Sequence, residues 1–285
     1  MITSLLKKIK FLILGICILF SPQICGVNVI FDLGGVLIET NTLAAFNQLG
    51  IFNTLHYIFS LNNPLQLKNR LFELLNNIET NYENVHNAQD GQDNKLPNIF
   101  CEWLAGESTI AEIKEKIASY TKKNPEFFNN SAEKDLLTLA INNTFSPESL
   151  TKIRKIIKPG LKFVKECKKQ GHTLFILSNW DKESFPYTCE KFSDLFELFD
   201  ADKIIISGDI NLIKPDPTIY EYLLKSQNLD PKDCIFFDDQ EINVEAANQL
   251  GIHGVICKKS TYKKMIKELN SFVEKTKLSD DKKNS

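Results

Sequence analysis

Three carboxylates follow apolar runs that have the composition of buried strands. Asp32 ends the run 27–32, and Asp238 and Asp239 follow the run 234–237. If these runs are neighbouring strands of a parallel sheet, their carboxyl ends meet at one edge, where such sheets bind ligands. Carboxylates so close together repel one another unless a cation joins them, and Mg²⁺ is a hard cation that takes oxygen ligands. The pattern therefore predicts a Mg²⁺ site that includes Asp32, Asp238 and Asp239.

A hydroxyl, an amide and an ammonium group are expected at the same edge. Ser178 and Asn179 end the predicted strand 173–177, and Lys214 lies in the loop beyond the predicted strand 203–206. The outer oxygens of a phosphoryl group require groups of these kinds. Together with the carboxylates, they indicate a small phosphorylated substrate.

Each of these residues also has a purely structural interpretation. Asp32 precedes a Gly-Gly pair, and Asp and Gly are common in turns. Ser178 could cap the helix that follows it, Lys214 could be a solvated loop residue, and the pair 238–239 could bind surface lysines. Only the joint occurrence of these residues at strand ends favours a catalytic role.

Strands and helices alternate regularly after residue 150. Asp216 and Pro217, for example, form a typical helix start before the predicted helix 218–227. Alternation at this spacing is typical of βαβ units, in which helices cover both faces of a parallel sheet. We therefore expect an α/β fold with a doubly wound, Rossmann-like parallel sheet of about five strands. The predicted strands are 27–32, 173–177, 203–206, 234–237 and 253–257.

The segment 40–150 differs, because it shows helical periodicity and no convincing strand. The predicted helices are 65–75, 109–120 and 132–141. Between the first two, residues 76–98 are polar and rich in Asn, so we expect an exposed loop there. The predicted organisation is an α/β core over 27–39 and 151–258, an inserted helical cap over 40–150, and a C-terminal helix and tail over 259–285.

Four segments, in this order, resemble the four motifs of the haloacid dehalogenase superfamily, in its phosphatase branch. They are FDLGGVL (31–37), LSN (177–179), KPDPTIY (214–220) and FFDDQEINVEAANQLG (236–251). The inserted segment 40–150 stands where that superfamily places its helical cap. The chain looks most similar to the subgroup that contains sugar-1-phosphate phosphatases and the phosphatase domain of soluble epoxide hydrolase.

The resemblance implies a Mg²⁺-dependent phosphatase. Asp32 would be the nucleophile that forms an aspartyl-phosphate, and it would also bind the metal. The main-chain carbonyl of Gly34 and the carboxylate of Asp239 would be further ligands. Asp238 would complete the metal site by orienting a metal-bound water or Lys214.

The same resemblance implies which residues hold the phosphoryl group. Ser178 and Asn179 would bind its oxygens, and Gly34 and Gly35 would belong to the phosphate-binding loop. Lys214 would neutralise charge on both the nucleophile and the phosphoryl group, which gives it a catalytic as well as a binding role.

Gly34 departs from the pattern of the superfamily. Many of its phosphatases carry an aspartate two residues after the nucleophile, where it acts as general acid and then as general base. A glycine carbonyl can still bind metal, but the lost proton transfer is worth about 10²–10⁴ in rate. A catalytically weak protein that binds phosphate or a protein partner therefore stays open. Carbon–halogen hydrolysis also stays open, although it needs no metal and the acidic pair 238–239 argues against it.

The first 26 residues have the pattern of a secretory signal peptide. Three lysines precede the apolar run 11–20, and small residues follow at 25–26. The run is shorter than the ~20 residues of a membrane span, but an uncleaved anchor over residues 9–24 stays open. We expect an exported protein, periplasmic or secreted, that meets the membrane only through this leader if the leader is retained.

The charge balance argues against a nucleic-acid partner. The chain has 34 basic and 36 acidic residues and a formal net charge of −2, so no basic surplus attracts a polyanion. The sequence leaves the oligomeric state open.

Overall fold

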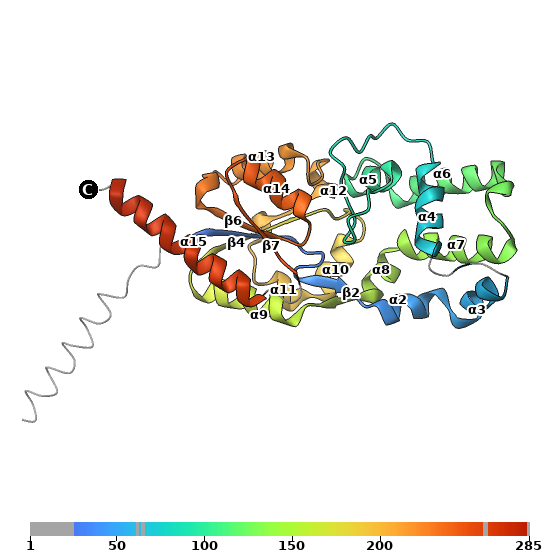
Figure 1. The fold of residues 1–285 in the computed structure, drawn as a ribbon, viewed down its shortest axis with the longest axis horizontal. Helices are drawn as coiled ribbons and strands as arrows, with labels where there is room; N and C mark the ends of the chain where they lie inside the picture. Colours follow the sequence, from blue (N-terminus) through green and yellow to red (C-terminus); the bar gives the residue numbers. More distant parts are fainter. Residues whose placement is uncertain (1–25, 61–62, 64–65, 259–261, 284–285) are drawn as a thin grey trace, which may run out of the picture.

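A five-stranded parallel sheet forms the centre of the protein (Figure 1). The computed structural model describes residues 26–60, 63, 66–258 and 262–283. The strand order is β5-β4-β1-β6-β7, and every neighbouring pair is parallel. The strands are β1 (Asn28–Phe31), β4 (Thr173–Ser178), β5 (Ile204–Ile206), β6 (Cys234–Asp238) and β7 (His253–Ile256). The predicted doubly wound α/β fold is confirmed.

Alternate residues of the central strand pack into two different layers. In β1, Val29 and Phe31 belong to one hydrophobic cluster and Ile30 to another, and all three are fully buried. Because helices cover both faces of the sheet, its strands are almost continuously apolar. Across the sheet, Phe31 stacks on Phe237 of β6 with ring centroids 5.7 Å apart.

The helices that cover the sheet divide between these two clusters. α9 and α15 contribute to the cluster of Phe31, and α13 and α14 contribute to the cluster of Ile30. α13 begins where the sequence predicts, because the Asp216 side chain accepts a hydrogen bond from the Thr218 N–H over 2.9 Å. The helical elements of the α/β core are α9 (Lys158–Lys169), α10 (Phe185–Lys191), α11 (Ser193–Phe196), η3 (Ala201–Lys203), α12 (Ser207–Ile210), α13 (Pro217–Ser226), η4 (Pro231–Asp233), α14 (Glu241–Gln249) and α15 (Tyr262–Lys283).

A helical region, residues 41–153, lies to one side of the sheet (Figure 1). Two short antiparallel strands, β2 (Ile38–Thr40) and β3 (Arg154–Ile156), carry the chain into and out of it. Helices form at all three predicted places (α4, α6 and α7), and α2, α3, α5 and α8 were not predicted. The elements are α2 (Thr42–Leu49), α3 (Ile51–Phe59), α4 (Leu67–Asn76), α5 (Asn98–Leu104), α6 (Ile110–Lys123), η2 (Pro125–Phe127), α7 (Ser131–Thr144) and α8 (Pro147–Ile153).

The loop between α4 and α5 is mostly exposed, as its composition predicts, but a few buried residues anchor it to the protein. Asn84 is buried, and its side-chain amide donates to the carbonyls of Ala88 and Leu96 over 3.0 and 3.1 Å. Its side-chain oxygen accepts from the Ala88 N–H over 2.7 Å. One Asn side chain thus satisfies backbone groups that regular secondary structure would otherwise pair. A polar and mostly exposed loop is therefore fixed against the protein.

The sequence predicts a signal peptide at one end of the chain and a helix with a tail at the other. Residues 1–25 of the predicted signal peptide, which include the alternative anchor, lie outside the described residues. At the other end, α15 continues to Lys283 and takes in most of the predicted tail. Within the described ranges, no helix combines the length and the apolar character that crossing a membrane requires.

Candidate active site

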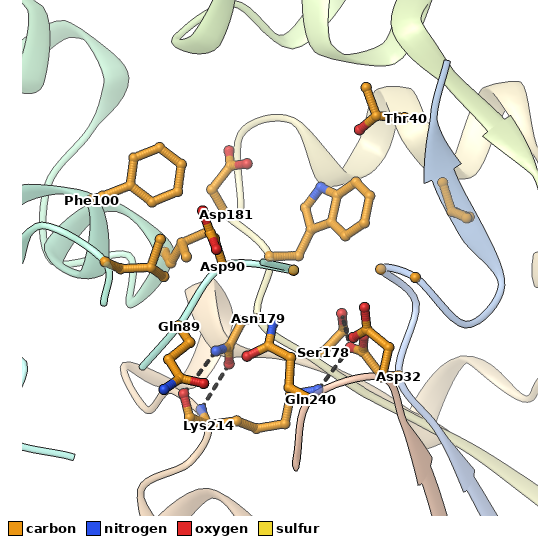
Figure 2. A pocket seen from close by; sticks show the side chains of 18 of the residues that line it. Asp32, Thr40, Gln89, Asp90, Phe100, Ser178, Asn179, Asp181, Lys214 and Gln240 are labelled. Carbon is orange, nitrogen blue, oxygen red and sulfur yellow. Dashed lines mark hydrogen bonds and ion pairs between the residues drawn. The ribbon is translucent and has the colours of Figure 1, made fainter. Parts of the chain in front are cut away.

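Four buried polar side chains meet at the carboxyl end of the sheet. The ammonium group of Lys214 lies 2.7 Å from Asp32 Oδ1 and 2.6 Å from Asp238 Oδ2. The hydroxyl of Ser178 donates to the same oxygen of Asp32 over 2.7 Å. Asp32 follows β1, Ser178 ends β4 and Asp238 ends β6, so the parallel register of the sheet brings the three together. Figure 2 shows Asp32, Ser178 and Lys214 side by side at the base of a pocket.

Asn179 holds the backbone of Lys214 in place. Its side-chain amide donates to the Lys214 carbonyl over 2.9 Å and accepts from the Lys214 N–H over 2.8 Å (Figure 2). The resemblance implied that Asn179 binds phosphoryl oxygens. In the structure, its amide oxygen and one of its N–H groups position the lysine that reaches Asp32, and phosphate binding by Asn179 stays a prediction.

Asp238 is surrounded by hydrogen-bond donors. It is fully buried, and the side-chain amide of Asn243 lies 3.1 Å from each of its carboxylate oxygens. The Gln240 N–H donates to Asp238 Oδ1 over 2.9 Å, and Lys214 approaches Oδ2. A buried carboxylate is costly unless it is paired and hydrogen-bonded. Asp238 is therefore a fixed acceptor that aligns the ammonium group of Lys214.

Burial and charge oppose each other in this cluster. Burial raises the pKa of Asp32, and the charge of Lys214 and the hydrogen bond from Ser178 only partly offset it. Burial also acts to lower the pKa of Lys214, but the Asp238 and Asp32 carboxylates outweigh it, so that the pKa is raised. Lys214 is therefore a permanent cation between two carboxylates.

Asp239 adds a third carboxylate to a cluster that contains one ammonium group. Carboxylate oxygens of Asp32, Asp238 and Asp239 all lie within 4.8 Å of one another. Burial, followed by repulsion from Asp32 and Asp238, raises the pKa of Asp239 to about 8. One ammonium group cannot neutralise three carboxylates, so the cluster favours a bound cation. An all-oxygen donor set of this kind fits Mg²⁺.

Gly35 allows Asp239 to approach the rest of the cluster. Its φ is +71°, and a Cβ at this position would overlap the Asp239 carboxylate. The Gly35 N–H donates to the Ile38 carbonyl over 2.9 Å. The resemblance placed Gly35 in the phosphate-binding loop, but its amide is used by this turn. Glycine is required here for the left-handed turn and for the close approach of Asp239.

A cavity of about 660 Å³ opens over the cluster. Asp32, Ser178, Lys214 and Asp239 line its base. Its walls are partly apolar and include the side chains of Phe100, Trp103, Leu104, Leu150 and Trp180. The site therefore combines a polar base with room for an organic group above it.

The tip of the loop between α4 and α5 closes another side of this cavity. A Cβ placed on Gly91 would lie 3.7 Å from Asp239 Oδ2, so the loop backbone approaches the carboxylate cluster. Lys68 holds this tip through Asp90, at 2.5 Å, and through the side-chain oxygen of Gln92, at 2.6 Å. The helical region thus contributes directly to the site (Figure 2).

Comparison with protein families gives a match over most of the chain. Residues 28–251 match the haloacid dehalogenase-like hydrolase family. The chain belongs to the haloacid dehalogenase-like hydrolases. The predicted membership of this superfamily is confirmed.

Known members of the haloacid dehalogenase-like hydrolases match parts of the chain. Bifunctional epoxide hydrolase 2 of Rattus norvegicus is 30% identical over 102 residues, which are 35% of this chain and 18% of that protein. A haloacid dehalogenase-like hydrolase domain-containing protein of Arabidopsis thaliana is 25% identical over 155 residues, which are 50% of this chain and 49% of that protein. The chain thus spans half or less of the length of these relatives.

Solved structures of haloacid dehalogenase-like proteins have the same fold. A HAD family enzyme of Bacteroides thetaiotaomicron, in complex with magnesium and inorganic phosphate, has a TM-score of 0.51 at 19% identity and covers 82% of this chain and 95% of its own. A predicted HAD-like family hydrolase of Porphyromonas gingivalis has a TM-score of 0.51 at 18% identity, with 86% and 97% covered.

The structure of this haloacid dehalogenase-like hydrolase brings together the side chains that the sequence singled out at strand ends. Asp32, Ser178, Lys214, Asp238 and Asp239 form one cluster. Their roles in catalysis and metal binding remain predictions that follow from this placement.

Sequence reasoning missed two parts of the site. The loop tip 89–92 was not expected near the catalytic edge, although its Asp and Gly residues are typical of a tight turn. Arg154 also lines the cavity. Its only signal in the sequence was its residue type, because it is one of two arginines in the chain.

Proposed function

We propose that the chain is a Mg²⁺-dependent phosphatase that hydrolyses a small phosphomonoester through an aspartyl-phosphate on Asp32. The observation that carries this proposal is the position of Lys214, whose ammonium group bridges Asp32 and Asp238 beside a third carboxylate, Asp239. The base of the cavity thus offers a nucleophile, a fixed cation and a place for a metal within one cluster. Phosphoryl transfer depends on this combination of positioning and charge.

The residues present fit the implied metal. Asp32 and Asp239, with the main-chain carbonyl of Gly34, would hold Mg²⁺. Bound Mg²⁺ would neutralise negative charge on the carboxylates and on the phosphoryl oxygens. The Bacteroides thetaiotaomicron structure has the same fold and contains magnesium and inorganic phosphate, which supports magnesium as the cation here.

The protein's own residues divide the reaction into two displacements. The carboxylate of Asp32 attacks phosphorus, an O–P bond forms, and the bond from phosphorus to the ester oxygen breaks. Water then attacks phosphorus, which releases inorganic phosphate and restores the Asp32 carboxylate. Lys214 and Ser178 hold Asp32 in position for both steps.

Gly34 determines which esters react well. The leaving oxygen needs a proton in the first step, and glycine has no side chain to donate it. Lys214 is a poor replacement, because its raised pKa keeps the proton on nitrogen. Esters with good leaving groups, such as anomeric, aryl or acyl phosphates, depend least on such a proton donor and should therefore react fastest.

Gly34 is also the observation that favours a second candidate function, a weakly catalytic protein that binds phosphate. In that case the first displacement would occur, and the absence of a general base at position 34 would leave the aspartyl-phosphate long-lived. The cavity and the carboxylate cluster would serve binding rather than turnover.

Release of inorganic phosphate distinguishes the two candidates. The protein is incubated with sugar phosphates, nucleotides and aryl phosphates, in the presence of Mg²⁺ or of EDTA. We expect many turnovers on at least one ester with Mg²⁺ and a loss of activity with EDTA. A burst of one phosphate per chain, followed by no further release, would favour the binding protein. Turnover that persists in EDTA would contradict the metal dependence.

A further inference from the structure

The two arginines of this chain have different electrostatic partners. They stand among 34 basic residues, all others being lysine. Arg70 stacks on the ring of Phe127, with 4.4 Å from the guanidinium carbon to the ring centroid. Its Nε and Nη2 groups donate to the two carboxylate oxygens of Glu133 over 2.8 and 3.4 Å. Arg70 shows how this protein uses a guanidinium edge: the edge holds one carboxylate with two hydrogen bonds.

Arg154 has a similar setting without the carboxylate. Its guanidinium carbon lies 5.2 Å from the centroid of the Trp180 ring, and its Nη1 donates to Thr40 Oγ1 over 2.9 Å. Its Nε is buried and has no hydrogen-bond partner among the described residues. Nε belongs to the edge that Arg70 uses for Glu133, and in Arg154 no acceptor in the described part of the chain meets this atom.

The charge of Arg154 is poorly compensated. Burial lowers the pKa of its guanidinium, and Asp181 is the one described carboxylate whose charge opposes this effect. Asp181 does not come within ion-pair distance of Arg154, and its own oxygens accept hydrogen bonds from the main chain of Glu183 and Ser184 and from the Ser184 hydroxyl. Arg154 is only partly buried, so its guanidinium stays within reach of a ligand. Among the described residues it has no anionic partner, and a ligand anion in the cavity could supply one.

Arg154 lines the same cavity as the catalytic cluster. The other cations of the cavity wall, within the described residues, already have carboxylates, because Lys214 binds Asp32 and Asp238 and Lys68 binds Asp90. Figure 2 shows Thr40, the hydrogen-bond partner of Arg154, well removed from Asp32 across the pocket. A ligand that fills the cavity can therefore meet Asp32 at one end and Arg154 at the other.

A second donor without a partner belongs to a residue that lines the same cavity. The indole Nε1 of Trp103 is buried and makes no hydrogen bond to the described residues, although Trp103 lines the cavity. A buried N–H group that lacks an acceptor is uncommon in folded proteins. Two donors without acceptors in the lining of one cavity favour a ligand that carries acceptor oxygens besides its phosphoryl group.

We propose that Arg154 binds a second anionic group of the substrate, so that the substrate is a phosphomonoester with a carboxylate at its far end. The inference rests on the phosphatase function proposed above and adds the class of substrate. A carboxylate matches the planar Nε–Nη2 edge with two parallel hydrogen bonds, as Glu133 does at Arg70. Lysine offers no such edge, which accounts for an arginine at this position in a chain whose other cations are almost all lysine.

The test compares matched pairs of esters. Each pair consists of an ω-carboxyalkyl phosphate and the alkyl phosphate of the same length that ends in methyl, over a series of chain lengths. We expect kcat/KM to favour the carboxylate by about tenfold or more at the best length, since hydrogen bonds to a charged group carry the difference. Equal kcat/KM values at every length would overturn the inference and leave the phosphatase proposal standing. If neither series and no aryl phosphate is hydrolysed, the phosphatase proposal itself is wrong.

Three variants locate the preference. Arg154→Met keeps apolar packing on Trp180 and removes the charge, so the ratio of the two kcat/KM values should fall to near one. Arg154→Lys keeps the charge without the planar edge and should retain only part of the ratio. Lys152→Met removes an exposed charge two residues away and should not change the ratio. A preference that survives in Arg154→Met would overturn the assignment.

A bisphosphate arm identifies the second anion. Alkanediol bisphosphates of the same lengths carry a phosphoryl group where the first series carries a carboxylate. A weaker preference for these compounds supports the carboxylate, and a stronger one would replace it with a second phosphate. These comparisons use the wild-type protein, so they show which second anion the substrate carries even if Arg154→Met does not fold.

Discussion

Lys214 and Asp32 are 182 positions apart in the chain, and their side chains form a buried ion pair of 2.7 Å. β1 delivers Asp32 to the carboxyl edge of the sheet, and the loop beyond β5 returns Lys214 to the same point. Asn179 and Asp238 fix the backbone and the ammonium group of this lysine. The site therefore depends on strands that are far apart in the sequence. Substitution of either Lys214 or Asp32 tests the role of this ion pair.

Lys214→Met should abolish most phosphatase turnover. The variant leaves Asp32 and Asp238 buried without their cation, and loss of a preorganised charge of this kind lowers rates by about 10²–10³-fold. It should also lower the free energy of unfolding by about 3–5 kcal/mol, since a buried pair has been broken. Phosphate release and urea unfolding measure the two effects. Lys225→Met, an exposed position on α13, is the matched control, and equal rates in both variants would contradict the role of Lys214.

Gly35→Ala should weaken the metal site. The added Cβ would overlap the Asp239 carboxylate and displace it from the cluster. Displaced ligands lower metal affinity by about 10–100-fold, so the Mg²⁺ concentration for half-maximal activity should rise accordingly. Gly171→Ala provides the control, because Gly171 also has a positive φ, +80°, with no atom within 4 Å of the new Cβ. A similar shift in both variants would mean that backbone strain, and not Asp239, is responsible.

Gly34→Asp should raise the turnover of alkyl phosphates. A Cβ at this position meets only Asp32 Oδ2, at 3.6 Å, and needs no change in the backbone. The new carboxyl group could protonate a poor leaving group, which is worth up to about 10²–10⁴ in rate. Aryl phosphates should gain little. Gly34→Asn has the same shape and cannot transfer the proton, so a gain in both variants, or in neither, would contradict this explanation.

The Arg70–Glu133 pair should make stability depend on pH. Burial acts to raise the pKa of Glu133, but hydrogen bonds from Arg70 and from the Asn129 N–H outweigh it and lower the pKa from its usual 4.5. Because the folded value is depressed, the pair stabilises the protein fully above about pH 4.5 and loses this contribution as pH falls through the lowered pKa. Glu133→Gln should therefore be less stable than wild type at pH 7.

Urea unfolding between pH 7 and pH 3 measures this effect. The difference in the free energy of unfolding between wild type and Glu133→Gln should narrow as the pH falls below about 4.5. Glu126→Gln, which removes an exposed acid nearby, shows the effect of net charge alone. A difference that widens towards low pH would contradict the assignment.

Much of the fold could be predicted because its signals are local. β1 and β6 are short apolar runs that end in acids, and Asp216 with Pro217 marks the start of α13. Parallel strands place their carboxyl ends at one edge, so residues such as Asp32 and Asp239 could be grouped without a structure. The grouping of these residues at one edge follows from the parallel direction of the strands alone.

The remainder depends on tertiary contacts that composition does not encode. Residues 77–97 are polar, yet the Asn84 side chain pairs their backbone and the loop reaches the cavity. The sequence predicts phosphate binding by Asn179 because it follows Ser178, but it does not show that one N–H and the oxygen of its side-chain amide bind the backbone of Lys214. Arg154 enters the site through the β2–β3 pair, a contact between residues on either side of the helical region.

Trapping of the covalent intermediate shows whether Asp32 becomes phosphorylated during turnover. The protein is mixed with Mg²⁺ and an aryl phosphate, quenched in acid during turnover and digested, and the peptides are analysed by mass spectrometry. We expect a phosphoryl group on the Asp32 side chain in wild type and no phosphoryl group on this residue in Asp32→Asn. Steady turnover with no adduct on Asp32, or an unchanged rate in Asp32→Asn, would contradict this expectation.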